Sequence, residues 1–200
     1  MAEFAGGRLL LLGSSLIAIG TAGFYHLPGM IEADAGGSRL VNSIYCSTMT
    51  LTTVGYGDIC PGANMDIIGR AFIVALSFCG LGMFCGPVMD FASSWTHDVP
   101  GGAIGAALTT LALGIGLFTV LEDFTETEAA YFTIVTGTTI GFGDRSPTSD
   151  AGKIAAAVFA ILVINVTGGL LEPAASFLSS YCMRKDAAAI EGNGNGKKVL

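Results

Sequence analysis

Two short segments of the chain place glycine at alternate positions within one pattern. They read TTVGYGD at Thr52–Asp58 and TTIGFGD at Thr138–Asp144. A cation that sheds its water needs oxygen ligands, and backbone carbonyls that point to one axis can supply them. Glycine at every second position permits such a backbone, because glycine reaches left-handed angles without a steric penalty. The two segments are therefore candidate carbonyl strips for a dehydrated cation.

The two segments belong to an internal repeat, in which matching residues such as Thr52 and Thr138 lie 86 positions apart. The register continues without a gap into the apolar runs that follow. Matched pairs include Tyr45 and Tyr131, Thr50 and Thr136, Gly82 and Gly168, and Pro87 and Pro173. A repeat that keeps its register over this length indicates one structural unit used twice.

Four apolar runs approach the roughly 20 residues that a helix needs to cross a bilayer. They are Leu9–Tyr25, Ile67–Ala92, Ala103–Leu121 and Lys153–Leu178. Between the runs of each pair lie Asn42–Pro61 and Ala129–Pro147, which are too short to cross and too apolar for a solvated loop. Backbone of this kind survives at membrane depth where protein buries it or water lines it, so both segments are predicted to be re-entrant. They enter from the same side, because an even number of spans separates them.

Composition narrows the class of protein. Of 200 residues, 52% are hydrophobic and 12% are charged, which is about half the charged fraction of soluble domains. The net charge of −7, with 9 Lys and Arg, argues against nucleic acid as a partner, since phosphate binding needs a basic face. We find no nucleophile–base pair, metal cluster or phosphate loop, and expect no enzymatic activity. Arg8 before the first run is compatible with a signal peptide, but no convincing cleavage site follows, so we expect a retained span.

The predicted fold is an all-α membrane protein with four transmembrane helices and two re-entrant pore loops, arranged as span–pore–span twice. The expected divisions are a first repeat at 1–95, a cytoplasmic connecting loop at 96–102, a second repeat at 103–183 and a flexible cytoplasmic tail at 184–200. Arg8, Arg184 and Lys185 favour cytoplasmic termini. The chain is expected to be a multi-pass protein of the lipid bilayer, in the plasma membrane or an organelle membrane.

Over Leu9–Tyr181 the sequence resembles the two-pore-domain (tandem-pore) potassium channel family, in which a first Gly-Tyr-Gly strip with a second Gly-Phe-Gly strip is a common combination. The resemblance implies K⁺ as the permeating ion, with no cofactor. It also implies that two chains pair so that four pore loops surround one axis with pseudo-fourfold symmetry. The implied filter residues, which bind through their carbonyls, are Thr53, Val54, Gly55, Tyr56, Gly57, Thr139, Ile140, Gly141, Phe142 and Gly143.

The sequence leaves two alternatives for the partner and two for the function. The second chain of the pair is either another copy of this chain or a related subunit. A less selective cation channel or transporter-like pathway is one alternative, although proteins of that kind generally keep one glycine per filter repeat and four repeats per chain. A non-conducting regulatory subunit is another, against which the two intact strips argue.

Two tyrosines are predicted to support the filter. Tyr45 and Tyr131 each lie 13 residues before the acid that follows a strip, Asp58 or Asp144. Potassium channels typically have a pore-helix aromatic near this place that braces the acid, so we expect Tyr45–Asp58 and Tyr131–Asp144 contacts. The alternative is that the tyrosines only pack and the acids face outer water.

Four residues of the second and fourth runs are candidates for gating or for the inner cavity. Gly82 and Gly168 either bend their helices or allow close helix packing. Asn165 either faces water below the filter or bonds a neighbouring helix. Glu172 either attracts cations at the inner mouth or pairs with a basic residue.

Overall fold

The computed structural model describes residues 2–32, 35–59, 61–62, 65–84 and 100–194. All regular secondary structure within these ranges is helical. The helices are α1 (Ala2–His26), α2 (Arg39–Leu51), α3 (Ile67–Phe84), α5 (Gly102–Leu121), α6 (Glu126–Gly137) and α7 (Asp150–Gly194). The order long, short, long therefore occurs twice, as the internal repeat predicts.

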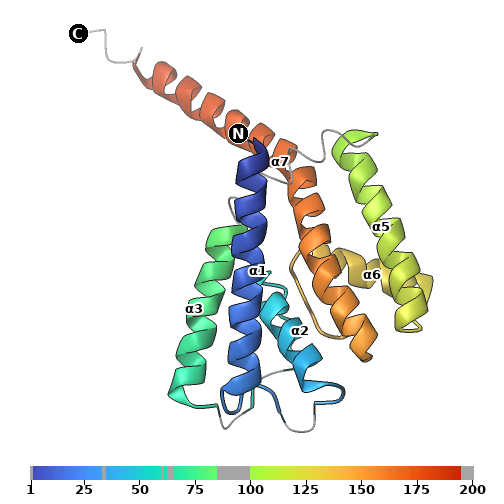
Figure 1. Cartoon of the computed structure of the whole chain (residues 1–200). Coiled ribbons are helices and arrows are strands. Elements are labelled where there is room, and N and C mark those ends of the chain that lie inside the picture. The colour runs from blue at the N-terminus through green and yellow to red at the C-terminus, as the bar shows by residue number, and fades with distance from the viewer. Residues whose placement is uncertain (1, 33–34, 60, 63–64, 85–99, 195–200) are drawn as a thin grey trace.

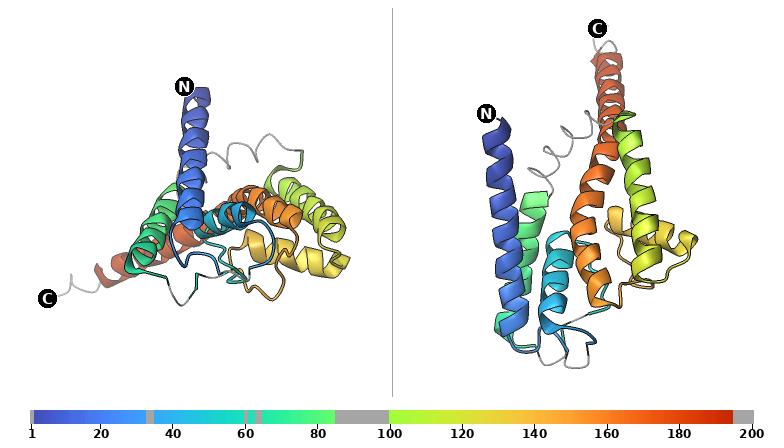
Figure 2. Two further views of the ribbon diagram at one scale, coloured as in Figure 1. Left: turned by 60° about the horizontal axis from the view of Figure 1, so that its bottom comes forward. Right: turned by 45° about the vertical axis from the view of Figure 1, so that its right-hand side comes forward.

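Each repeat places its short helix against its two long ones. In the first repeat α2 contacts α1 and α3, and in the second α6 contacts α5 and α7. The repeats meet where α2 also packs on α7, so that α2 lies between α1 and α7 in the right-hand view of Figure 2. The start of α1 and the far end of α7 lie at the same end of the molecule (Figure 1).

The two short helices begin differently. The N-cap of α6 is Thr125, whose side chain accepts a hydrogen bond from the backbone N–H of Glu128, while the Glu128 carboxylate accepts one from the backbone N–H of Thr125 at 3.0 Å. This capping box satisfies two amide groups of the first turn reciprocally. The N-cap of α2, Ser38, makes no such side-chain bond. The start of α2 therefore depends on groups outside its own first turn.

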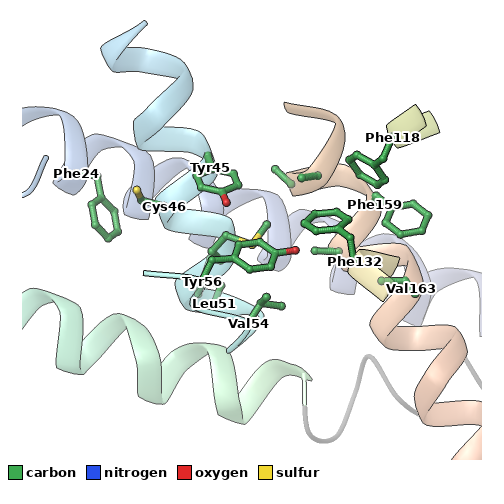
Figure 3. Packing of buried hydrophobic residues seen from close by; sticks show 14 of the residues in the cluster. Phe24, Tyr45, Cys46, Leu51, Val54, Tyr56, Phe118, Phe132, Phe159 and Val163 are labelled. Carbon is green, nitrogen blue, oxygen red and sulfur yellow. The ribbon is translucent and has the colours of Figure 1, made fainter. Parts of the chain in front are cut away.

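Aromatic side chains from both repeats form the centre of the hydrophobic core (Figure 3). The ring of Tyr56 stacks on that of Phe132 with centroids 5.5 Å apart, although the two residues belong to different repeats. Phe118 of α5 and Phe159 of α7 continue the cluster with edge-on contacts. Burial of such large rings is the main source of packing energy in a core of this kind. The segment after α2 is thus held by the second repeat.

Among the described residues, two stretches are long and apolar enough to cross a membrane, namely Gly102–Leu121 and Asp150–Leu171. A third, Ile67–Met83, is apolar but shorter. Large apolar side chains such as Phe78, Leu108 and Val158 are exposed on these helices, as expected of surfaces that face lipid rather than water. The all-helical, membrane-type architecture predicted from the sequence is therefore confirmed at this coarse level.

The helix bounds differ from the predicted runs at the ends of α1 and α7, which are both longer than predicted. We expect a flexible tail from residue 184, but α7 continues to Gly194. The run of alanines at 187–189 explains this, because alanine has the highest helix propensity. The expected second span, Ile67–Ala92, is described only to Phe84, and most of the connecting loop at 96–102 also lies outside the described residues.

Candidate functional site

The two candidate strips, Thr53–Gly57 (the first strip) and Thr139–Gly143 (the second strip), have the same alternating backbone. Positive φ falls on every other residue: 60°, 52° and 76° at Thr53, Gly55 and Gly57, and 55°, 53° and 74° at Thr139, Gly141 and Gly143. A backbone that alternates between left-handed and right-handed residues turns successive carbonyls toward one side of the chain. In an ordinary strand, successive carbonyls point to opposite sides. The glycines are as predicted. The left-handed conformation of Thr53 and Thr139 is not predicted by the sequence, because these positions are not glycines.

The end of a short helix holds each strip by the same hydrogen bonds. The amides of Val54 and Gly55 donate to the carbonyl of Met49 at 3.1 and 3.3 Å. In the second repeat the amides of Ile140 and Gly141 donate to the carbonyl of Val135 at 3.0 and 3.4 Å. The C-terminal ends of α2 and α6 therefore lie beside the strips, and the partial negative charge of a helix C-terminus favours a nearby cation.

The first strip is enclosed on its side-chain face. Val54 and Tyr56 are buried, while Thr53, Gly55 and Gly57 are exposed. The Tyr56 hydroxyl bonds to Thr136 of the other repeat. Thr136 already donates its own proton to the Phe132 carbonyl at 2.6 Å, so Tyr56 is the donor. The strip is thereby anchored on one face and open on the other.

The two strips lie directly beside each other. A Cβ atom added to Gly141 would overlap the carbonyl oxygen of Val54, and one added to Gly143 would overlap that of Tyr56. A Cβ atom on Gly55, by contrast, would meet no heavy atom within 4 Å among the described residues. The second strip thus has the first as its neighbour, whereas the first strip has open space beside Gly55.

Both predicted tyrosine–acid contacts are present. The Tyr45 hydroxyl donates to an oxygen of Asp58 at 2.9 Å and is fully buried. Tyr131 is more exposed, and its local desolvation together with its hydrogen bond to Asp144 raises the pKa of the phenol. The acid after each strip is therefore bonded to the short helix that precedes it. That these contacts support ion selectivity stays a prediction.

The candidate gating residues are less uniform. Gly82 is exposed, and a Cβ atom there would meet nothing within 4 Å, whereas Gly168 is buried. Asn165 donates to the carbonyl of Ile161, and its side-chain oxygen is buried with no partner among the described residues. The side chain of Glu172 lies outside the described residues. The hinge and cavity roles stay predictions.

The acidic residues that precede α6 include a carboxylate that fixes the segment after the second strip, a contact that the sequence does not predict. Glu122, just after α5, accepts hydrogen bonds from the amides and hydroxyls of Thr148 and Ser149 at 2.7–3.1 Å. Burial alone would raise the pKa of Glu122, but the bonds from Ser149 and Thr148 outweigh it and hold that pKa below the usual value. A neighbouring ion pair joins Glu128 to Arg145. The segment after the second strip is thus held within its own repeat.

Comparison with known proteins agrees with this repeated geometry. A family model described as "Ion channel" matches twice, at residues 12–96 and 105–180. "Two pore potassium channel b" of Oryza sativa subsp. japonica is 45% identical over 194 residues, covering 81% of this chain and 53% of that protein.

More distant relatives carry similar names. "Potassium channel subfamily K member 4" of Mus musculus is 30% identical over 58% of this chain and 35% of that protein. "Two-pore potassium channel 2" of Arabidopsis thaliana is 23% identical over 62% of this chain and 36% of that protein. The chain spans about half or less of the length of these relatives. The resemblance found in the sequence is confirmed, and the chain belongs to the ion channel family, with one copy of the family's unit in each repeat.

Proposed function

We propose that the chain is a subunit of a potassium-selective channel that conducts K⁺ passively through four carbonyl strips, two from each of two chains. The observation that carries this proposal is the alternating left-handed backbone, present in the same register in two strips that touch. Such a backbone offers a row of neutral oxygens, which can replace the water around a cation without binding it too tightly to leave. The channel needs no cofactor, and K⁺ itself is the bound species.

The unequal burial of the two repeats supports a second chain. Four positions of the first repeat are buried, while the four that match them in the second repeat are exposed. The exposed fractions are 1, 2, 3 and 5% at Tyr45, Thr48, Val54 and Tyr56, against 39, 55, 51 and 66% at Tyr131, Ile134, Ile140 and Phe142. Exposed apolar side chains gathered in this way favour an interface. A second copy, or a related subunit, would cover them with its own first repeat.

The helix contacts support the same assembly. Within the chain α2 packs on α7, and α7 corresponds to α3 of the other repeat. The matching contact, α6 on α3, does not occur among the described residues. A twofold partner that offers its α3 to α6 would supply it and close a pseudo-fourfold ring of four strips. This arrangement makes α1, α3, α5 and α7 the four transmembrane helices of each multi-pass chain, with α2 and α6 as pore helices.

The remaining site residues have proposed roles in this pore. Asp58 and Asp144, held by their tyrosines, lie just outside the filter and keep its outer end in place. Gly82 and Gly168 lie on the inner helices α3 and α7, where bending would open or close the inner mouth. Asn165 lies on α7 below the filter, where its side-chain oxygen can face the ion path. Glu172 is assigned to the inner mouth from its position in the sequence.

The reversal potential of the purified protein in a planar bilayer, under opposed potassium and sodium gradients, tests the proposal. Reversal close to the potassium equilibrium potential is the expected result. Reversal near zero would favour the less selective cation pathway, and absence of current in the pure protein would favour a non-conducting subunit. Gly143→Ala should abolish the current, and Gly116→Ala is the matched control, because a Cβ atom at that exposed helical position meets nothing within 4 Å.

A further inference from the structure

A buried lysine connects the start of α7 to the first pore helix. Lys153 is only 4% exposed. Its ammonium donates to the carbonyl of Gly36 and to the side-chain oxygen of Asn42, both at 2.9 Å. Asn42 in turn donates its amide to the same Gly36 carbonyl at 3.1 Å. The three groups form a closed set of hydrogen bonds that joins the two repeats, and Lys153 lies more than 100 positions from both of its partners in the sequence.

Asp150, one turn earlier on α7, makes a second connection to the same place. Its two carboxylate oxygens accept from the amide of Ser38 at 3.0 and 3.1 Å. Ser38 is the N-cap of α2, where an added negative charge is stabilising and where the amides of the first turn need acceptors. A Cβ atom at Gly37 would overlap the Asp150 carboxylate, so glycine at this position makes room for it. Asp150 of α7 thus supplies an acceptor for the amide of the N-cap residue of α2.

The lysine bonds are costly to lose. Among the described residues Lys153 forms no direct ion pair, and its ammonium bonds only to neutral oxygens, with the Asp150 carboxylate on the other side of Gly37. A buried ammonium that loses such acceptors leaves an uncompensated charge, and so its geometry is strongly fixed. Asn42 lies one turn before Tyr45 on α2, and Tyr45 bonds Asp58 after the first strip. Lys153 is thus connected, through Asn42 and Tyr45 of α2, to the acid that follows that strip.

A cavity of about 370 Å³ lies beside Lys153 and the acid that follows the first strip. Its lining includes Glu32, Asp58, Pro147 and Lys153, which come from both repeats. The segments that follow the first and second strips therefore meet at the same place as the lysine. Because the cavity lies beside Asp58, the position of this carboxylate is set by a few hydrogen bonds rather than by close packing.

Among the described residues the bonds of Lys153 have no equivalent at the matching positions of the other repeat. The positions that match Lys153 and Asn42 are Ile67 and Glu128, and Glu128 is already bonded to Thr125 and Arg145. An isoleucine cannot donate a hydrogen bond. In a twofold assembly the contact between α6 and the partner's inner helix would therefore lack the connection that α2 makes with α7.

We propose that Lys153 and Asp150 form an outer latch, which holds the first pore helix against α7 and so positions the first strip for selective conduction. This inference rests on the proposed function. A complete channel then has four interfaces between a pore helix and an inner helix. The two interfaces within the chains, α2 on α7, carry the latch. The two interfaces between the chains, α6 on the partner subunit's α3, lack it. Lys153 and Asp150 are positioning residues, since neither faces the ion path directly.

The test compares two variants that each remove one positive charge, K153M and R70Q. Arg70 is exposed near the start of α3, and its side chain makes no hydrogen bond or ion pair among the described residues, so R70Q reports the effect of charge alone. In planar bilayers the ratio of sodium to potassium permeability should rise at least about threefold in K153M, because a buried hydrogen-bond network is broken, and stay at the wild-type value in R70Q. Equal ratios in K153M and wild type would overturn the proposal, as would equal changes in both variants.

Two further measurements keep the result decisive. If K153M is not recovered as a folded assembly, D150N takes its place, because it retains the shape of the side chain and weakens only the acceptor for Ser38. Hydrogen exchange should be faster in α2 of the variant, with α5 unchanged, and unchanged exchange in α2 would overturn the latch. If the wild type itself reverses near zero, the proposed function fails, and the exchange measurement still decides whether the latch exists.

Discussion

The two pore loops share one backbone and differ in nearly everything that surrounds it. In the first repeat, the face behind the strip is covered by α6 and α7 of the second repeat. In the second repeat, the matching face is bare. Local sequence therefore determines the conformation of each strip, because the same hydrogen bonds from the same helix end recur in both. The burial of each strip is determined by what covers its side-chain face, and a single chain provides no such cover for the second strip.

The polar anchors differ in the same way. The first pore helix is held by groups of the other repeat, through Asp150 and Lys153. The second is held within its own repeat, through the capping box of Thr125 and the carboxylate of Glu122. The repeat that is buried within one chain is thus tied across the chain. The repeat that would face a partner has the anchors of its pore helix within itself, so these anchors do not depend on the partner.

The largest effect is expected from Gly141→Ala and Gly55→Ala, which break the two sides of this comparison. Each places a side chain at positive φ, which costs roughly 1–2 kcal/mol for an L-residue. Gly141→Ala also meets the Val54 carbonyl within the chain, whereas Gly55→Ala meets nothing there. If a partner strip fills that space, both variants should abolish potassium current in bilayers. Current that survives in Gly55→Ala alone would contradict closure of the ring.

A smaller effect is expected from Glu122→Ala, which removes the self-contained anchor of the second repeat. Loss of several hydrogen bonds to a charged group should lower the stability by about 2 kcal/mol, measured as a drop in melting temperature of the detergent-solubilised protein. Glu126→Gln, on the exposed first turn of α6, is the control and should change little. A melting temperature equal to that of the control would remove this anchor from the account.

The same carboxylate predicts a pH dependence. Its pKa is lower in the folded protein than in the unfolded chain, whose usual value is 4.5. Its stabilisation is therefore fully present above that value and is lost as pH falls through the folded pKa. Between pH 5 and 3, as a rough window, the melting temperature of the wild type should fall more steeply than that of Glu122→Gln. Parallel curves would contradict the assigned bonds.

Tyr56→Phe tests the hydrogen bond between the repeats. It removes the donor to Thr136 and keeps the stacking on Phe132, so we expect a loss of about 1 kcal/mol and shorter open times in single-channel records. Unchanged open times in this variant would show that stacking alone holds the first strip.

The smallest change, of opposite sign, is expected from Phe142→Tyr. In the second strip Phe142 has no hydroxyl, and the position that matches Thr136 is Thr50, which likewise donates to the helix carbonyl of Cys46 at 2.8 Å. A tyrosine could bond Thr50 of the partner subunit and stabilise the assembly by up to about 1 kcal/mol. The measure is the fraction of dimer that survives mild heating. A lower fraction than in the wild type would contradict this placement of the second chain.

The backbone chemistry could be read from the sequence, and the interface could not. Alternating glycines and the 86-residue register led to both strips. The resemblance to potassium channels led to the tyrosine–acid pairs, of which Tyr45 and Asp58 form a hydrogen bond at 2.9 Å. The left-handed Thr53 and Thr139 were not predictable, since a helix end and its hydrogen bonds force a conformation that threonine itself disfavours. In the sequence, Lys153 stands at the start of an apolar span, and no neighbouring residue indicates its hydrogen-bond partners. Bonds between residues this far apart in sequence depend on how the repeats pack, which periodicity does not encode.

The central claim is that four strips from two chains hold dehydrated cations on one axis. Crystals of the assembled protein grown in rubidium or thallium salts test it most directly, because these ions replace K⁺ and scatter anomalously. The account predicts a row of anomalous peaks on the twofold axis, each surrounded by carbonyl oxygens of Thr53–Gly57 and Thr139–Gly143 from both chains. Strips that face lipid or lie apart, with no peaks between them, would contradict it.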